Sequence, residues 1–295
     1  MTTVGFIGLG QMGGGMSRNI LKGGHTVRAF DLDKDAVAKF ADEGGVACAT
    51  AAEAAEGAAL VFTMLPIGAI VERAVLGADG VADGIAADAL LVDMSTILPE
   101  ETKAIGAALK ARTGTPMIDA PVGRTSAAAW AGTSVFMVGG AAADIERARP
   151  YMELMGESIH VCGDLGAGAM LKLVNNYVSI VINLATAEGM TLATTGGVDP
   201  EVAREVMSLT PAGQGHLNTA WPDKALKDDP EPAFMLDLAY KDLGLALETA
   251  AKMNVPLATG GAGRSIYSAA RAMGHGRSDW TTGIYRTVQA LTRGA

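Results

Sequence analysis

The sequence predicts an α/β protein with an N-terminal doubly wound sheet and a C-terminal all-helical domain. In the first half of the chain, short apolar runs alternate with helical patterns, which is typical of βαβ units. The first of these runs are continuous rather than alternating, as expected for parallel strands that helices cover on both faces. After about residue 164 the strand pattern stops, and only helical patterns follow.

The expected strands lie at residues 4–8, 27–31, 46–50, 60–65, 90–95, 117–122, 134–139 and 159–162. A glycine-rich hinge at 163–168 precedes a long, mainly apolar helical pattern that ends near Gly196 and Gly197. Further helices are expected at 199–208, 234–253 and 256–273, with prolines marking the loops between them. We therefore predict a sheet domain at 1–163 and a helical domain at 164–295, joined by the long helix.

Composition narrows the class of protein. With 295 residues, of which 49% are hydrophobic and 19% charged, the chain is expected to be globular and is long enough for two cores. The formal charge of −9 argues against a nucleic-acid partner, because phosphate binding needs clustered lysine and arginine. The long apolar helix carries too many polar residues for an ordinary membrane span.

Cysteine usage and the N-terminus indicate a location. The two cysteines, Cys48 and Cys162, lie far apart, which indicates a reducing compartment, and the chain enters its first strand without a signal-peptide pattern. These observations predict a cytoplasmic protein. Histidine and cysteine are too scattered along the sequence to predict a metal site.

A glycine-rich turn follows the first strand and matches the pattern G-x-G-x-x-G at the mouth of a helix. Glycines there allow a tight turn and the close approach of a pyrophosphate, whose charge the helix N-terminus stabilises. The pattern predicts a nicotinamide dinucleotide site of the Rossmann type. Its expected cofactor-binding residues are Gly8, Gly10, Gln11, Met12 and Gly13.

Asp31 ends the second expected strand, about twenty residues after the turn. A carboxylate there can accept hydrogen bonds from both ribose hydroxyls and would repel a 2′-phosphate. We therefore expect NAD rather than NADP, although Arg28 and Lys34 lie nearby and argue the other way. Ligands in such sheets lie beyond the carboxyl ends of the strands, so Leu65 and Thr96 are further expected cofactor contacts.

Four polar residues recur on one side of the long helix, at i, i+3, i+4 and i+7: Lys172, Asn175, Asn176 and Ser179. Their neighbours are apolar, so the narrow stripe favours a buried cleft over a solvent face. Lys172 could donate a proton to a carbonyl oxygen as a hydride reaches its carbon, with the asparagines orienting substrate and lysine. The four histidines lie in turns, a strand and a loop, and do not suggest a His–carboxylate pair instead.

Arg124 follows the sixth expected strand, in the segment Gly123-Arg124-Thr125-Ser126. A guanidinium offers forked donors that match a carboxylate, phosphate or sulfonate, and Gly123 lets the backbone bend towards a ligand. The two hydroxyls can add further hydrogen bonds. The segment predicts a clamp for an anionic substrate, with a solvated loop arginine as the alternative.

Several motifs together resemble the β-hydroxyacid dehydrogenase family, nearly from end to end. They are Gly8–Gly13, Asp119-Ala-Pro-Val122, Gly132-Thr133, Lys172-Leu-Val-Asn-Asn176 and Lys241-Asp242-Leu243. The resemblance implies a Rossmann domain joined by a long helix to an all-helical domain, with Lys172 as the catalytic lysine. It also implies that Lys241 reaches the cofactor from the second domain, and it favours a homodimer or homotetramer.

One departure from the family pattern is informative. Most members follow Pro-Val with Ser-Gly-Gly, whereas this chain has Gly123-Arg124-Thr125-Ser126, which resembles a branch of the family that reduces a sulfonated aldehyde. The resemblance implies reversible, NADH-dependent reduction of such an aldehyde. A carboxylate semialdehyde, or a 3-hydroxyisobutyrate-type substrate, is the alternative. The expected substrate-binding residues are Gly123, Arg124, Thr125, Ser126, Asn175, Asn176 and Ser179.

Two other classes of protein fit the sequence less well. Reduction of an imine in a related fold is disfavoured by Lys172, because relatives that act on imines tend to lack this lysine. A dinucleotide sensor or scaffold without turnover would need the glycine turn, but it would have no use for a lysine–asparagine stripe.

Overall fold

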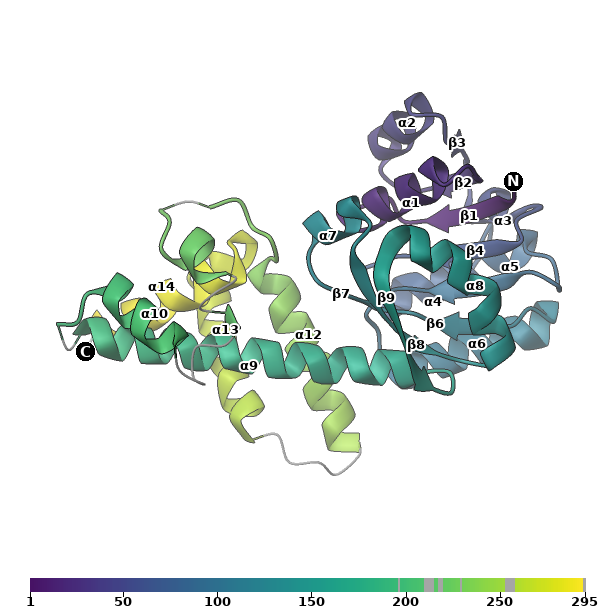
Figure 1. The fold of residues 1–295 in the computed structure, drawn as a ribbon. Helices are drawn as coiled ribbons and strands as arrows, with labels where there is room; N and C mark the ends of the chain where they lie inside the picture. Colours follow the sequence, from purple (N-terminus) through teal and green to yellow (C-terminus); the bar gives the residue numbers. More distant parts are fainter. Residues whose placement is uncertain (196, 210–214, 217–219, 229, 253–257, 294–295) are drawn as a thin grey trace. The chain divides into compact units, whose positions relative to one another are not determined.

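The structure is a computed structural model of the 295-residue chain and describes residues 1–195, 197–209, 215–216, 220–228, 230–252 and 258–293. The chain divides into two compact units, Met1–Lys172 and Leu173–Ala295, here termed the N-terminal and C-terminal units (Figure 1). The division falls inside helix α9 (Ala167–Thr195), which begins in the first unit and continues in the second. The sequence predicts the boundary nine residues earlier, at 163/164, where the strand pattern stops.

A single sheet of nine strands forms the centre of the N-terminal unit. Its strands are β1 Thr3–Ile7, β2 Thr26–Phe30, β3 Val46–Ala47, β4 Leu60–Thr63, β5 Leu90–Asp93, β6 Met117–Asp119, β7 Val122–Gly123, β8 Ser134–Gly139 and β9 Gly156–Gly163. The order is β3-β2-β1-β4-β5-β6-β8-β7, with β9 on β8. Neighbouring strands in the part β3-β2-β1-β4-β5-β6 pair in parallel. This is the doubly wound arrangement that the alternating pattern predicts.

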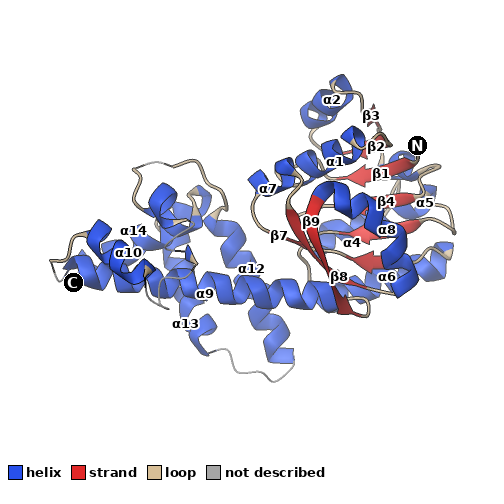
Figure 2. Cartoon of the chain, in the orientation of Figure 1, coloured by secondary structure: helices blue, strands red, loops and turns tan. Residues whose placement is uncertain are grey.

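Helices cover both faces of this sheet (Figure 2). They are α1 Gly13–Lys22, α2 Lys34–Asp42, α3 Ala51–Ala55, α4 Gly68–Leu76, α5 Val81–Gly84, α6 Pro99–Thr113, α7 Ser126–Ala131 and α8 Ala142–Met155. Phe6 and Phe62 pack with α1 and α8, whereas the adjacent residues Ile7 and Val61 pack with α4 and α6. Because successive side chains of a strand point to opposite faces, both faces of the parallel strands must be apolar, which explains their continuous apolar runs.

The expected strand at 117–122 is wrong, because the structure divides it into two. β6 ends at Asp119 and pairs in parallel with β5, whereas β7 begins at Val122 and pairs antiparallel with β8. Pro121 lies between them, and its lack of an amide hydrogen removes a ladder bond at this position. The break carries the segment that contains Arg124 to the edge of the sheet.

The described part of the C-terminal unit consists of helices, loops and one isolated bridge between Met235 and Asp279. After α9 come α10 Pro200–Ser208, a π-helical turn at Trp221–Ala225, α12 Leu236–Lys252, α13 Ala258–Ala272, a 3-10 turn at His275–Arg277 and α14 Trp280–Arg293. Trp221 and Tyr267 are fully buried among apolar side chains of α9, α12 and α14. Helix α14 was not expected, although Ile284 and Val288, at i and i+4, both pack on this core. The first residues of the helix expected at 256–273 lie outside the described residues.

One stretch of α9, Ala167–Ala187, is long and apolar enough to cross a membrane by length and composition alone. The same stretch carries Lys172 and the two asparagines that follow it. Ile180 and Leu184 are buried in the core of the C-terminal unit. One side of this stretch is therefore packed in that core, while 39% of its most apolar window is buried overall.

Candidate active site

The glycine turn between β1 and α1 has the geometry that a phosphate-binding loop requires. Gly8 has φ +100°, in the left-handed region, and a Cβ there would lie 2.3 Å from the carbonyl oxygen of Met64. A Cβ at Gly13 would lie 2.0 Å from the carbonyl oxygen of Gly8, so only glycine lets α1 begin this close to β1. Around Gly10 no heavy atom other than those of its chain neighbours lies within 4 Å of the Cβ position, which leaves the middle of the turn open to a ligand phosphate. The remaining residues of the turn, Gln11 and Met12, lead directly into α1.

The carboxylate of Asp31 lies beside this turn, at the end of β2. Its Oδ2 accepts a hydrogen bond from the amide of Leu9 at 2.6 Å, and its Oδ1 accepts one from the amide of Asp33 at 2.8 Å. These two bonds fix the side chain at the place where the ribose of a dinucleotide lies in this fold.

Leu65 and Thr96 follow β4 and β5 at the same carboxyl edge of the sheet as the glycine turn. The amide of Leu65 donates to Ser95 Oγ at 2.9 Å, and the amide of Ser95 donates to Asp93 Oδ1 at 3.1 Å. The two strand ends are therefore tied together. Leu65 and Thr96 are both partly exposed, so both can contact a ligand at this edge.

Arg124 lies directly after β7 and adopts a left-handed backbone conformation with φ +75°. Its Nη1 donates to the carbonyl oxygen of Thr133 at 2.9 Å, and its Nη2 pairs with the carboxylate of Glu157 on β9. Each side chain of this pair is nearly half exposed. The guanidinium that the sequence assigns to a substrate anion thus has an acidic partner in this structure. A substrate anion would compete with Glu157 for this guanidinium.

The two hydroxyl residues after Arg124 lie at the start of α7. Thr125 is exposed and Ser126 is partly exposed, while the buried Gly123 ends β7. The four residues of the segment are therefore continuous at one sheet edge, with two of their side chains directed away from the core.

The expected polar stripe lies on α9 with the helical spacing that the sequence predicts. Lys172 is the last residue of the N-terminal unit, and Asn175, Asn176 and Ser179 lie in the first turns of the C-terminal unit. Asn176 is buried, whereas Lys172 and Ser179 are partly exposed and Asn175 is exposed. The stripe thus contains one anchored amide and three side chains that solvent or a ligand can reach.

A buried carboxylate, Asp242 on α12, anchors this stripe. Asn175 Nδ2 donates to Asn176 Oδ1 at 3.1 Å, and Asn176 Nδ2 donates to Asp242 Oδ2. Asp242 Oδ1 faces the ammonium of Lys241 at 3.0 Å, an ion pair rather than an aligned hydrogen bond. The carboxylate, only 3% exposed, therefore joins a predicted substrate residue to a predicted cofactor residue. No local pattern in the sequence predicts a role for Asp242, because its partner on α9 lies 66 positions away.

Replacement of Asp242 by asparagine should destabilise the protein measurably. Asp242→Asn leaves Lys241 without its buried counter-charge, and the new amide cannot accept from Asn176 and satisfy the lysine equally well. We expect the free energy of unfolding, measured by urea titration, to fall by about 1–3 kcal/mol. Glu248→Gln on the same helix is the matched control, because Glu248 pairs with Lys252 at 2.8 Å with both side chains about half exposed. The free energy of unfolding of Glu248→Gln should fall by less than about 0.5 kcal/mol. An equal fall in the two variants would contradict the role of Asp242.

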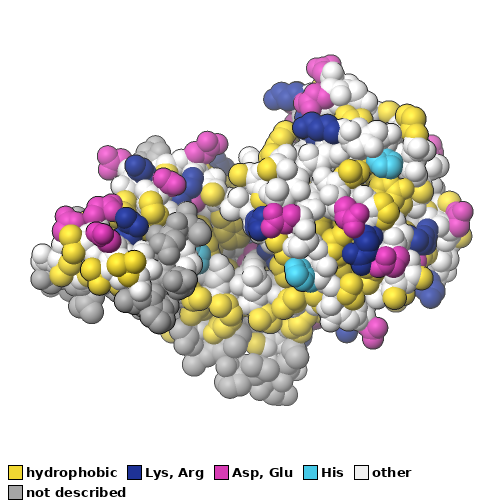
Figure 3. All heavy atoms as spheres, viewed as in Figure 1, with side chains coloured by type: hydrophobic (Ala, Val, Ile, Leu, Met, Phe, Trp, Pro, Cys, Tyr) yellow, Lys and Arg dark blue, Asp and Glu magenta, His cyan; other side chains and the backbone are white. Residues whose placement is uncertain are grey.

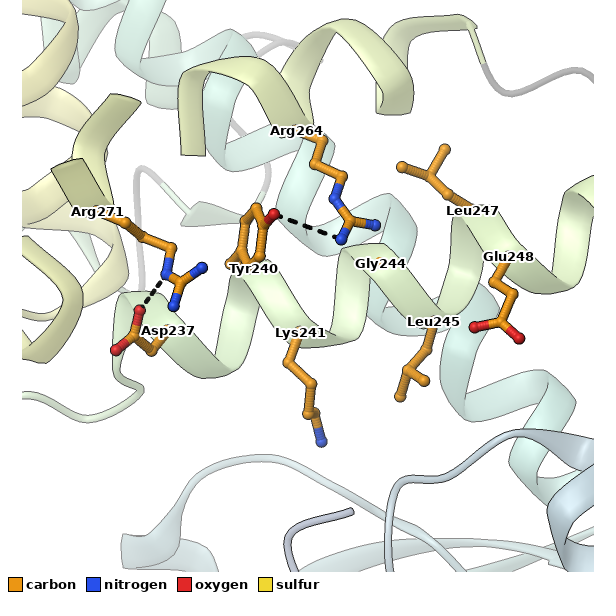
Figure 4. Close-up of a pocket in the computed structure, with 9 residues that line it drawn as sticks. All are labelled: Asp237, Tyr240, Lys241, Gly244, Leu245, Leu247, Glu248, Arg264 and Arg271. Atoms are coloured by element: carbon orange, nitrogen blue, oxygen red, sulfur yellow. Dashed lines mark hydrogen bonds and ion pairs between the residues drawn. The ribbon is translucent and has the colours of Figure 1, made fainter. Parts of the chain in front are cut away.

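Lys241 also lines a cavity of about 610 Å³ on α12 and α13 (Figure 4). Arg264 and Arg271 place their guanidinium carbons 4.7 and 4.4 Å from the centre of the Tyr240 ring. A Cβ at Gly244 would lie 2.7 Å from Arg264 Nη1, so the missing side chain lets this arginine lie across the helix. Figure 4 shows the Lys241 side chain extending away from this aromatic group.

His216 contacts the last residue of the stripe, which the sequence did not indicate. Its Nε2 lies 2.7 Å from the carbonyl oxygen of Ser179 and 3.2 Å from Ser179 Oγ. Because a carbonyl oxygen only accepts, Nε2 carries the proton. Burial lowers the pKa of His216 and outweighs the opposing effects of the Ser179 carbonyl and Asp279, which favours the neutral ring. The histidine therefore acts as a neutral donor that positions Ser179.

Surface charge is mixed on the face drawn in Figure 3. Basic and acidic side chains of the N-terminal unit lie next to each other there, and ion pairs such as Arg147–Asp144 and Arg149–Glu146 belong to this unit. Within the described ranges, no group of three or more His, Cys, Asp or Glu side chains could hold a metal ion.

A glycine turn at the mouth of a parallel sheet, with a fixed carboxylate at the next strand end, defines a dinucleotide-binding protein. Residues 3–163 match the family model described as the NAD binding domain of 6-phosphogluconate dehydrogenase. Residues 166–287 match the model described as NAD-binding of NADP-dependent 3-hydroxyisobutyrate dehydrogenase. The class is therefore a nicotinamide-dependent dehydrogenase.

The chain belongs to the β-hydroxyacid dehydrogenase family, of which 3-hydroxyisobutyrate dehydrogenase is a member. It is 46% identical to 3-sulfolactaldehyde reductase of Escherichia coli over 281 residues, which cover 95% of this chain and 94% of the relative. It is 39% identical to 3-hydroxyisobutyrate dehydrogenase of Pseudomonas aeruginosa over 274 residues, covering 91% and 92%. The solved structure of Mycobacterium tuberculosis 3-hydroxyisobutyrate dehydrogenase with L-serine superposes with a TM-score of 0.86 at 33% identity, covering 97% and 99%. The protein is an oxidoreductase that acts on a hydroxyacid or the corresponding aldehyde.

Proposed function

We propose that the protein catalyses the reversible reduction of 3-sulfolactaldehyde to 2,3-dihydroxypropane-1-sulfonate with NADH. The segment Gly123–Ser126 carries this proposal. It puts a guanidinium and two hydroxyls at one sheet edge, and a sulfonate offers three acceptor oxygens to such a set of donors. The similarity to the E. coli 3-sulfolactaldehyde reductase along 95% of the chain supports the same substrate.

In the proposed reaction the glycine turn and Asp31 would hold NADH, which would supply the hydride for the aldehyde carbon. The ammonium group of Lys172 donates a proton to the aldehyde oxygen, and in the reverse direction the neutral amine takes the proton from the alcohol. Arg124, Thr125, Ser126, Asn175 and Ser179 would bind the sulfonate and the neighbouring hydroxyl. Asn176, which Asp242 anchors, would orient the lysine and substrate.

A panel of aldehydes tests the proposal. NADH oxidation is measured with sulfolactaldehyde, succinic semialdehyde and tartronate semialdehyde at matched concentrations. We expect kcat/KM for sulfolactaldehyde to exceed the other two by at least about tenfold, equivalent to about 1.4 kcal/mol of differential transition-state binding. An equal or higher value for either semialdehyde would reject the sulfonate assignment.

A carboxylate semialdehyde is the second candidate substrate. It is favoured by the 39% identity to the P. aeruginosa 3-hydroxyisobutyrate dehydrogenase, and Arg124 could bind a carboxylate with the same forked donors. A carboxylate offers two acceptor oxygens in one plane, whereas a sulfonate offers three in a tetrahedral array. The aldehyde panel separates the two candidates directly.

The preference for NADH over NADPH is proposed from Asp31. Its fixed carboxylate would meet the 2′-phosphate of NADPH with like charge. We expect Asp31→Asn to lower the ratio of kcat/KM with NADH to kcat/KM with NADPH by on the order of tenfold, about 1.4 kcal/mol. Asp33→Asn is the matched control, because the Asp33 carboxylate caps α2 through Asp35 and Ala36 and has no proposed contact with ribose. A similar change of the ratio in both variants would contradict the role of Asp31.

A cytoplasmic location and a homodimeric or homotetrameric assembly are also proposed. Assembly is supported by Val174, Val178 and Ile182 of α9, which recur at i, i+4 and i+8 and are 48%, 46% and 42% exposed. Light scattering of the purified protein would distinguish a monomer from the two proposed assemblies.

A further inference from the structure

The carboxylate of Asp119, the last residue of β6, binds the first turn of α9. Oδ1 accepts a hydrogen bond from the amide of Gly166 and Oδ2 accepts one from the amide of Ala169, each at 2.6 Å. Amides at the start of a helix have no partner inside the helix, so they need an acceptor from elsewhere. Here the acceptor comes from a strand about fifty positions earlier, and the side chain is only 1% exposed.

Two glycines, one on each of two neighbouring segments, make room for this carboxylate. A Cβ at Gly139, the end of β8, would lie 2.5 Å from Asp119 Oδ1. A Cβ at Gly168 would lie 2.8 Å from Asp119 Oδ2 and 2.2 Å from the carbonyl oxygen of Met137. The first turn of α9 is thus packed directly on the backbone of β8 and fixed through Asp119 to β6.

Asp119 also connects the segment that contains Arg124 with the start of α9, which carries Lys172. It immediately precedes the stretch that breaks at Pro121 and leads to Arg124. Through Ala169 it holds α9 three residues before Lys172, about 4.5 Å along the helix axis. All of these residues lie in the N-terminal unit. A movement of this first turn would therefore displace the lysine, and displacements of about 1 Å at reacting groups can cost 10²-fold in rate.

We propose that Asp119 is a positioning residue of the reduction, whose carboxylate fixes the first turn of α9 and thereby the place of Lys172 relative to β6 and the Arg124 segment. The inference rests on the proposed role of Lys172 as proton donor. It assigns a function to an acidic residue that touches neither cofactor nor substrate in the proposed scheme.

The charge state of Asp119 gives this role a pH dependence. Burial raises the pKa of its carboxyl to about 6, against the opposing effect of the two amide hydrogen bonds, and Asp93 on β5 adds to the rise. The charge of Asp119 also acts on Cys162 of β9, and the Lys103 side chain of α6 packs against Gly166, whose amide the carboxylate binds. Above pH 6 the ionised carboxylate accepts from both amides, and below it a protonated oxygen accepts poorly. The value of kcat should fall as the pH falls through about 6.

To test this proposal, kcat is measured for Asp119→Asn and Asp119→Ala, each made in the wild-type chain and in the Lys172→Ala variant. We expect Asp119→Asn, which keeps one acceptor oxygen, to lower kcat on the order of tenfold, and Asp119→Ala to lower it further. In both Asp119 variants the Kd for NADH should stay within about twofold of the wild-type value. The amides of Gly166 and Ala169 should exchange faster with deuterium, because they lose their acceptor. The fall of kcat near pH 6 should disappear. Asp199→Asn is the matched control, because Asp199 caps α10 through Glu201 and Val202 and that helix carries no proposed site residue.

The double variants separate positioning from general loss of structure. If Asp119 acts through Lys172, Asp119→Asn should leave the residual kcat of Lys172→Ala unchanged. The same fold-loss in both backgrounds, or a loss equal to that of Asp199→Asn, would overturn the inference. An unchanged kcat in Lys172→Ala alone would instead reject the proposed function of the lysine, and the inference with it.

Discussion

Lys172→Ala should lower kcat by a factor on the order of 10² to 10⁴, the range typical for removal of a general acid. The aldehyde oxygen gains negative charge as the hydride arrives at its carbon, and without the ammonium group only water can protonate it. Because the lysine acts in the transition state, kcat and kcat/KM should fall together. The Kd for NADH should change little, because the glycine turn and Asp31 are untouched.

Two further variants show which property of Lys172 matters. Lys172→Arg keeps the positive charge but replaces the ammonium by a group that does not release its proton near neutral pH, so its kcat should remain low. Lys252→Ala removes a lysine of α12 that pairs with the exposed Glu248, and its kcat should equal that of the wild type. Unchanged turnover in Lys172→Ala would remove the lysine from the proposed chemistry.

The parts of the fold that the sequence predicts are those in which neighbouring residues carry the signal. The apolar runs at β1, β4 and β5 show parallel strands, because both faces are covered and every position must be apolar. Gly8 and Gly13 predict the turn from the sequence. The structure gives the reason, because backbone atoms occupy the space that a side chain would need at both positions. The polar stripe of α9 follows from helical spacing alone.

Contacts between distant segments are what the sequence does not show. Asp119 and the amide of Ala169 are 50 positions apart, Asn176 and Asp242 are 66 apart, and Arg124 and Glu157 are 33 apart. No local period links such pairs, so a buried acceptor such as Asp242 looks like any charge on an amphipathic helix. The apolar run at 117–122 does not show the break at Pro121 for a related reason, since only the different strand partners of β6 and β7 reveal two strands.

Arg124→Gly should lower kcat/KM for the sulfonated aldehyde far more than for an uncharged aldehyde such as glyceraldehyde. Loss of a charged partner from a bound anion costs about 2–4 kcal/mol, or on the order of 30- to 1000-fold. The substitution suits the backbone, because Arg124 has φ +75°, where glycine is less strained than arginine. A loss of activity would therefore report the missing guanidinium rather than a distorted segment. Equal losses on both aldehydes would show that Arg124 has a structural role.

Glu157 provides the complementary measurement, because it holds the guanidinium that the sulfonate would need. Glu157→Gln removes the competing charge while the hydrogen bond from Arg124 to the carbonyl oxygen of Thr133 can persist. An ion pair this exposed contributes about 0.2–1 kcal/mol, so the KM for the sulfonated aldehyde should fall by at most about fivefold. The KM for glyceraldehyde should not change. A raised KM for the sulfonate would mean that Glu157 holds Arg124 in its binding position rather than competing for it.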